Sequence, residues 1–95
     1  MANISKHITY KEATKSTTAL RFGIENTPND YELQNMELIA EKVFEPLRRA
    51  VNGPIKINSF FRCEELNKAI GGSSRSQHCQ GRAIDIDDVY GYVSN

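Results

Sequence analysis

Residues 33–60, LQNMELIAEKVFEPLRRAVNGPIKINSF, contain the two elements that set the fold class. Apolar residues recur at steps of three and four along its first part, which predicts an amphipathic helix of about five turns packed on a core. Pro46 lies inside this helix and should kink it or remove a hydrogen bond. Asn52-Gly53-Pro54 ends the helix, and the apolar–polar alternation of residues 55–60 predicts a half-buried strand. The residues expected to point inward from the helix are Leu33, Met36, Ala40, Val43, Leu47 and Ala50, with Ile39, Phe44 and Val51 widening the stripe.

Short helical signals precede this stretch. Thr9-Tyr10-Lys11-Glu12 fits a capping box, in which the Thr hydroxyl accepts from the backbone N–H of Glu12 and the Glu side chain reaches back. We therefore expect two short helical segments between Ile8 and Gly23, separated near Ser16. Residues 27–30, TPND, carry turn and N-cap chemistry and should lead into the long helix.

A second helix and a second strand follow the first strand. Residues 64–70 are expected to form a short helix that turns Leu66, Ala69 and Ile70 inward and is capped by Gly71 in the left-handed conformation. Residues 72–77 are polar and loop-like, and residues 81–87, GRAIDID, predict the strand. Helices first, then strands separated by a short helix, indicate an α+β fold with N-terminal helices packed on a small antiparallel sheet.

Length and charge narrow the class of protein. Ninety-five residues make one domain, residues 1–95. Twelve Lys and Arg balance twelve Asp and Glu, so the chain lacks the basic footprint of a nucleic-acid binder. No apolar run could span a bilayer, and the N-terminal residues do not have the pattern of a signal peptide. Cys63 and Cys79 are expected to be reduced thiols, although a disulfide between them stays open, and the absence of a C-x-x-C pair excludes a zinc finger.

The stretch that carries chemistry is residues 76–85, SQHCQGRAID. A carboxylate such as Asp85 in an otherwise apolar strand is costly to desolvate unless it is paired or ligates a metal. His78 lies at a loop end, and Gly81 permits a tight turn that could bring the two side chains together. An imidazole nitrogen and a carboxylate oxygen are both good zinc ligands. The alternative is that both residues are hydrogen-bonded structural groups.

The pattern Ser-x-His-x-x-Gly-x-Ala-x-Asp in residues 76–85 resembles the zinc-binding signature of the zinc D-Ala-D-Ala carboxypeptidase family. These peptidoglycan peptidases include phage endolysins and share a fold with the hedgehog signalling domain. Residues 55–62, IKINSFFR, resemble the family's strand and Ser-x-x-Arg turn, and Glu45-Pro46-Leu47-Arg48 resembles its preceding helix. The resemblance covers roughly residues 8–88, with the motifs in the family's order, and it implies a hedgehog-like, DD-peptidase-like fold.

The resemblance assigns roles to four residues. His78 and Asp85 would be two zinc ligands. Arg62 would hold the carboxylate or a carbonyl of the substrate peptide, since a guanidinium fork donates two parallel hydrogen bonds. Ser76 would bond the substrate backbone or support the ligand loop. On the residues alone, a surface Arg and a loop hydroxyl bonded to its own backbone remain the alternatives.

The chain departs from the family pattern after Asp85. The family completes its site downstream with a second His and an acidic general base, but residues 86–95 contain no His. Asp87 and Asp88 are expected to be solvated carboxylates at the strand end, and His7 matches no family ligand. Cys79 is expected to pack rather than bind metal, because neighbours in an extended segment point to opposite faces. The resemblance thus implies a domain that is incomplete at its C-terminal end, with no identifiable catalytic base.

Three functions follow as hypotheses. The first is a zinc metallopeptidase of the cell-wall type, a hydrolase made in the cytoplasm and acting on peptidoglycan peptides by metal-assisted amide hydrolysis. The second is a non-catalytic module on the same scaffold, which binds peptidoglycan or a protein without cleaving it. The third is assembly, in which another chain contributes the missing ligand, for example through its His7. An uncovered sheet edge and apolar surface also favour self-association, and Tyr90 and Tyr92 are expected to cover such an edge.

Overall fold

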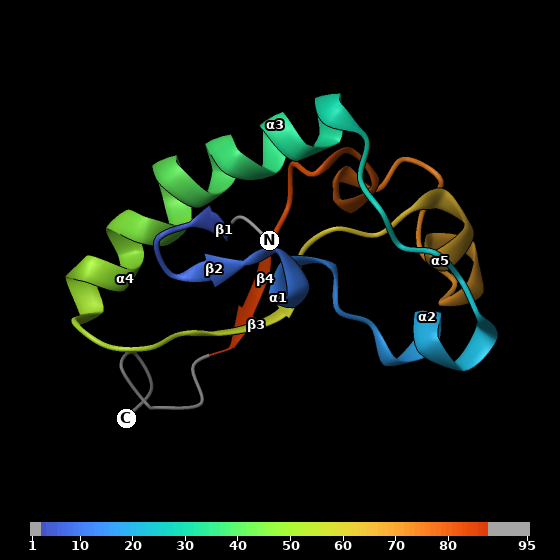
Figure 1. Cartoon of the computed structure of the whole chain (residues 1–95), viewed down its shortest axis with the longest axis horizontal. Helices are drawn as coiled ribbons and strands as arrows, with labels where there is room; N and C mark the ends of the chain where they lie inside the picture. The colour runs from blue at the N-terminus through green and yellow to red at the C-terminus, as the bar shows by residue number, and fades with distance from the viewer. Residues whose placement is uncertain (1–2, 88–95) are drawn as a thin grey trace.

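The computed structural model describes residues 3–87 and has an α+β fold with two small antiparallel sheets (Figure 1). A long helix crosses above both sheets, and α2 and α5 lie together at one end. Tyr90 and Tyr92 lie outside the described residues. The elements in chain order are β1 (Asn3–Ser5), β2 (Ile8–Thr9), α1 (Tyr10–Thr14), α2 (Thr17–Phe22), α3 (Asp30–Ile39), η1 (Ala40–Phe44), α4 (Glu45–Val51), β3 (Lys56–Ser59), α5 (Glu64–Ala69), η2 (Gln77–Gln80) and β4 (Asp85–Asp87).

Local capping sets the starts of the first three helices. The predicted capping box of α1 is present, since Thr9 accepts from the backbone N–H of Glu12 and the Glu12 side chain returns to Thr9. Ser16 separates α1 from α2 and caps α2 through its hydroxyl. Asn29 caps α3 in the same way. These boundaries agree with the sequence because each depends on residues only two or three positions apart.

The long helix contains a π-helical turn, η1, between α3 and α4. Within it the backbone N–H of Glu45 donates to the carbonyl of Ala40, five residues back. Pro46 follows in the first turn of α4, where a missing N–H is tolerated. The disturbance expected from Pro46 therefore takes the form of one wider turn, a known way for a helix to absorb a local obstacle. Asn52, in the left-handed conformation, ends α4 as predicted.

The π turn changes which residues of the long helix face the core. Met36, Ala40 and Phe44 are buried, whereas Val43 and Leu47 are 49% and 36% exposed. The prediction that Val43, Leu47 and Ala50 point inward was therefore wrong. A wider turn rotates all later residues around the helix axis, so Phe44 takes the place that regular spacing gives to Val43.

The sequence predicts the β3–β4 sheet but not the β1–β2 sheet. β3 and β4 pair antiparallel, with Ile57 opposite Ile86 and Ser59 opposite Asp85. The predicted second strand is shorter than residues 81–87, because the backbone N–H of Arg82 donates to Gln77 and residue 81 closes η2. The β1–β2 pair was not predicted, since five residues are too few to show alternation.

One hydrophobic core lies between the long helix and the strands. It also includes the two residues that follow β3, because Phe60 and Phe61 are both 2% exposed. In α5, Leu66 is buried as expected, but Ala69 and Ile70 are exposed and Asn67 is buried in their place. Asn67 points inward because its amide donates to the carbonyl of Ser73 and so holds the following loop. The core residues are Ile4, Ile8, Ala13, Met36, Ala40, Phe44, Phe60 and Phe61.

Within residues 3–87, the helices are too short or too polar for any of them to traverse a lipid bilayer.

Candidate metal centre

The turn η2 fixes the backbone around His78. The Ser76 hydroxyl accepts from the backbone N–H of His78 at 3.2 Å, and Gly81 closes the turn at φ +73°. A side chain at Gly81 would also collide with the backbone carbonyl oxygen of Glu32 in α3. The Asn35 amide donates to the carbonyl of Gln80 at 2.8 Å, so α3 holds the turn directly. Only glycine satisfies both the left-handed backbone and the close approach to α3.

The His78 ring is buried and has a polar neighbour at each of its two nitrogens. Its Nδ1 lies 2.7 Å from the backbone carbonyl oxygen of Phe60. Its Nε2 lies 3.2 Å from Oδ2 of Asp85, which β4 places opposite Ser59. The His78 side chain is 10% exposed and that of Asp85 is 59% exposed, so the pair is open to solvent from the carboxylate side.

The Phe60 contact decides which ring nitrogen carries the proton. A carbonyl oxygen can only accept, so Nδ1 of His78 must be the donor. In the neutral ring, Nε2 then presents a lone pair to the carboxylate of Asp85. Two acceptors at 3.2 Å repel each other unless a proton or a cation lies between them. A metal-binding His commonly has this arrangement, with its second nitrogen donating to a backbone carbonyl.

Arg62 and Ser76 lie beside His78 and are bonded to each other. Nη2 of Arg62 donates to the Ser76 hydroxyl at 3.3 Å, and the Arg62 backbone N–H donates to the carbonyl of His78 at 3.2 Å. The buried Nε of Arg62 has no hydrogen-bond partner among the described residues. The Ser76 hydroxyl is therefore occupied by the loop and by Arg62, whereas the guanidinium keeps an uncommitted donor.

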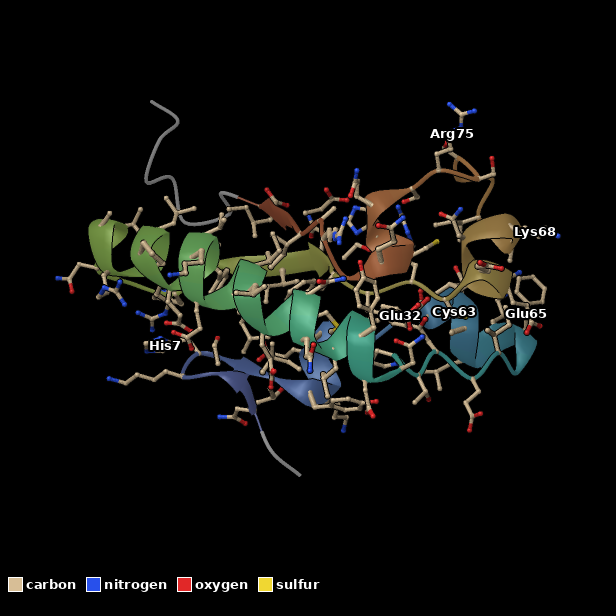
Figure 2. The ribbon with its side chains drawn as sticks, turned by 90° about the horizontal axis from the view of Figure 1, so that it is seen from above. His7, Glu32, Cys63, Glu65, Lys68 and Arg75 are labelled. Atoms are coloured by element: carbon tan, nitrogen blue, oxygen red, sulfur yellow. The ribbon has the colours of Figure 1, made fainter. Side chains whose placement is uncertain are left out.

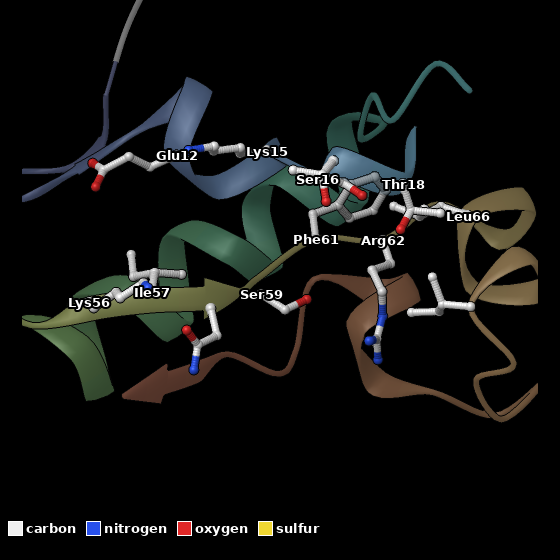
Figure 3. A pocket seen from close by; sticks show the side chains of 13 residues that line it. Glu12, Lys15, Ser16, Thr18, Lys56, Ile57, Ser59, Phe61, Arg62 and Leu66 are labelled. Atoms are coloured by element: carbon white, nitrogen blue, oxygen red, sulfur yellow. The ribbon is translucent and has the colours of Figure 1, made fainter. Parts of the chain in front are cut away.

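A groove of about 400 Å³ begins at Arg62 and runs between β3 and the α1–α2 segment (Figure 3). Lys15 and Ser16 lie along one side, and Lys56 and Ser59 lie along the other. Sequence reasoning missed the two lysines. No local pattern could have indicated them, because they are 41 positions apart (56 − 15) and only the fold brings their elements together.

His7, Cys63 and Cys79 have other contacts or environments that do not favour metal binding. His7 bonds Glu45, with Nδ1 of His7 2.6 Å from Oε1 of Glu45, and Figure 2 shows it near the long helix. Cys63 caps α5, with its sulfur accepting from the backbone N–H of Leu66. Burial raises the pKa of the Cys79 thiol, which disfavours the thiolate that a metal would need. Both cysteines are free thiols.

His78 and Asp85 are the two predicted ligands, and the structure brings them together without a third among the described residues. Across residues 3–87, no group of three or more His, Cys, Asp or Glu side chains could hold a metal ion. His78 and Asp85 nevertheless fit zinc in donor type, in the protonation state that Phe60 imposes and in their facing geometry.

Comparison with known proteins gives one match. A family model described as Peptidase M15 matches residues 6–92, nearly the whole chain. The matched range includes His78, Asp85, Arg62 and Ser76. Searches of curated proteins and of solved structures found no match.

Proposed function

The chain belongs to the peptidase M15 family, and we propose that it is a zinc metallopeptidase acting on the peptides of peptidoglycan, with His78 and Asp85 as two of the zinc ligands. The family membership makes a peptide the class of substrate. The metal, the cell-wall source of the peptide and the roles of individual residues are the proposal.

One observation carries the assignment of the metal. Nε2 of His78 faces Oδ2 of Asp85 at 3.2 Å, while Nδ1 of the same ring is committed to the Phe60 carbonyl. With the ring neutral, His78 Nε2 and Asp85 Oδ2 would both be acceptors, and they would hold a divalent cation between them as two ligands. The exposure of Asp85 leaves a path for the ion and for a peptide.

Each group of the site has a distinct task under this proposal. Zinc, when bound, supplies Lewis-acid polarisation of the scissile carbonyl and lowers the pKa of a water molecule. The Arg62 guanidinium holds a carboxylate or carbonyl of the peptide, because its fork presents several donors and Ser76 occupies only part of it. Ser76 positions both neighbours, since its hydroxyl bonds the Arg62 side chain and the His78 backbone. A third protein ligand and a general base would come from outside residues 3–87.

Zinc binding to Asp85 variants tests the proposal. We expect the full chain to bind zinc in equilibrium dialysis and Asp85→Asn to weaken binding by more than about tenfold. The exposed Asp85 side chain can be changed with little risk to the fold. Asp87→Asn is the matched control, because Asp87 lies two residues further along β4 and is also exposed.

Equal zinc affinity of the Asp85→Asn and Asp87→Asn proteins would remove the assignment. The same result would favour a structural ion pair, in which His78 carries both protons and simply bonds the carboxylate. Hydrolysis of a stem peptide ending in D-Ala-D-Ala, blocked by a chelator, then measures activity separately from metal binding.

A non-catalytic module is the second candidate, and one observation favours it. Among residues 3–87, no group of three or more His, Cys, Asp or Glu side chains could hold a metal ion. On this reading Arg62 and the groove bind the cell-wall peptide without cleaving it. Peptide binding that persists in the Asp85→Asn protein, with no chelator-sensitive hydrolysis by the unmodified protein, would support this candidate.

A further inference from the structure

The groove next to Arg62 is open to the backbone edge of β3. Its walls include all four consecutive residues of that strand, Lys56 to Ser59. Successive side chains of a strand point to opposite faces, so a cavity on one face would touch only every second residue. Contact with all four residues means that the groove follows the strand edge.

No strand among residues 3–87 covers that edge, although α1 packs beside β3 and the Phe61 backbone N–H, two residues beyond β3, donates to the Ala13 carbonyl. Within residues 3–87, the sheet that contains β3 has β4 as its other strand, so one edge of β3 has no strand beside it. An extended peptide can add to such an edge through main-chain hydrogen bonds, with alternate side chains giving specificity.

The charge of the groove favours an acidic peptide. Lys15, Lys56 and Arg62 line it, and Glu12 is the one carboxylate among the lining residues. Glu12 is held in the α1 capping box, where its Oε1 accepts from the backbone N–H of Thr9 at 3.1 Å. The three cations and one anion give the groove an excess of two positive charges (3 − 1), although the whole chain carries twelve of each sign.

The end of the groove at Arg62 is apolar. Leu66 and Phe61 are buried at 1% and 2% exposure, and Ile70 is 44% exposed at the end of α5. A fully acidic ligand would leave these side chains without complementary contacts. An extended peptide that alternates small apolar and acidic residues fits both surfaces.

We propose that this groove binds an extended, carboxylate-bearing peptide segment along the β3 edge, with Lys15 and Lys56 as the specificity-determining residues. The inference rests on the proposed function only for the identification of that segment with part of the substrate. Binding itself needs no metal, because neither lysine is in the His78–Asp85 pair.

The test uses the full chain and two end-capped hexapeptides. One alternates Ala and Glu, and the other alternates Ala and Gln, so that only side-chain charge differs and no terminal carboxylate reaches Arg62. We expect tighter binding of the Glu peptide at low salt, by about fivefold for each lysine engaged, and loss of this preference at high salt. Amide shifts in NMR should fall on β3 and the α1–α2 segment.

Lysine variants locate the effect. Lys15→Gln/Lys56→Gln should bind both peptides equally, whereas Lys42→Gln/Lys68→Gln removes the same charge outside the groove and should keep the preference. All four lysines are exposed, so neither variant threatens the fold. Equal binding of the two peptides by the unmodified protein, no binding of either, or an unchanged preference in Lys15→Gln/Lys56→Gln would each overturn the inference.

The same measurements separate this inference from the proposed function. Asp85→Asn should lose zinc and keep the preference for the Glu peptide. If the unmodified protein prefers the Glu peptide but does not bind zinc, only the proposed metal site is wrong. If it binds zinc but does not prefer the Glu peptide, only the proposed peptide binding in the groove is wrong.

Discussion

Glu45 is a buried carboxylate that links the N-terminal strands to the long helix. Its side chain is buried and accepts from the Ser5 hydroxyl at 2.5 Å, the His7 backbone N–H at 2.8 Å and the His7 ring at 2.6 Å. Burial raises the pKa of this carboxyl, but the bonds from His7 and Ser5 outweigh burial and lower the pKa to about 2. The charged form therefore ties the β1–β2 turn to the start of α4.

This pair predicts an acid-labile fold. The Glu45 pKa falls from 4.5 in the unfolded chain to about 2 in the folded one, so its stabilisation is complete above pH 4.5 and is lost as the pH falls toward 2. The shift corresponds to about 3 kcal/mol of unfolding free energy. Urea denaturation of the unmodified protein between pH 7 and pH 2 should show this loss.

The Glu45→Gln variant measures how much the charged Glu45 side chain contributes to the free energy of unfolding. The variant should be less stable at pH 7 by about 3 kcal/mol and show a flatter pH dependence below pH 5. Glu41→Gln, an exposed carboxylate one turn earlier in the same helix, should follow the unmodified protein. A pH dependence in Glu45→Gln as steep as that of Glu41→Gln would contradict the role given to Glu45.

Among the elements, η1 has the largest effect on packing. Because of the π turn, the buried residues of the helix continue from Ala40 to Phe44, and Val43 is left half exposed. This buried stripe then ends on Glu45, so the turn brings both the phenylalanine of the helix and its buried carboxylate to the core side.

A pair of alanine variants checks this register. Phe44→Ala should cost about 3–5 kcal/mol, because it opens a cavity in the core. Val43→Ala should change stability by no more than about 0.5 kcal/mol, as an exposed position does. Chemical denaturation measures both. A larger loss for Val43→Ala than for Phe44→Ala would restore the regular helical spacing and exclude the π turn.

In the whole molecule, the candidate metal pair spans two elements. His78 belongs to η2, which packs on α3, and Asp85 belongs to β4, which pairs with β3. An ion held between them would add a direct link between η2 and β4 to the hydrogen bonds from Phe60 and Arg62, so zinc should stabilise the folded state over the unfolded one.

Thermal unfolding tests this linkage. Zinc at a hundred times its Kd should add about 2.7 kcal/mol, which for a domain of this length raises Tm by on the order of 10 °C. Asp87→Asn should show the same rise and Asp85→Asn none. An equal rise in both variants would mean that zinc binds elsewhere on the chain.

The sequence by itself determined the local features of this protein. The caps at Thr9, Ser16 and Asn29, the helix end at Asn52 and the left-handed turn at Gly81 all depend on residues a few positions apart. The α+β class followed from their order. The ordered motifs around Arg62 and His78 also indicated the peptidase family, which the match over residues 6–92 confirms.

Only the tertiary structure decided the remaining features. The β1–β2 pair, the buried Glu45 network and the inward position of Phe44 each depend on how an element packs, and periodicity in the chain does not record packing. The same holds for the candidate metal site. The Phe60 carbonyl, which determines that Nδ1 of His78 is the protonated nitrogen, lies 18 positions before His78 in the chain. The cationic groove joins Lys15 with Lys56, which are far apart in the chain. Such long-range contacts form only when strands and helices pack together. They produce no regular pattern of residues in the sequence from which they could be predicted.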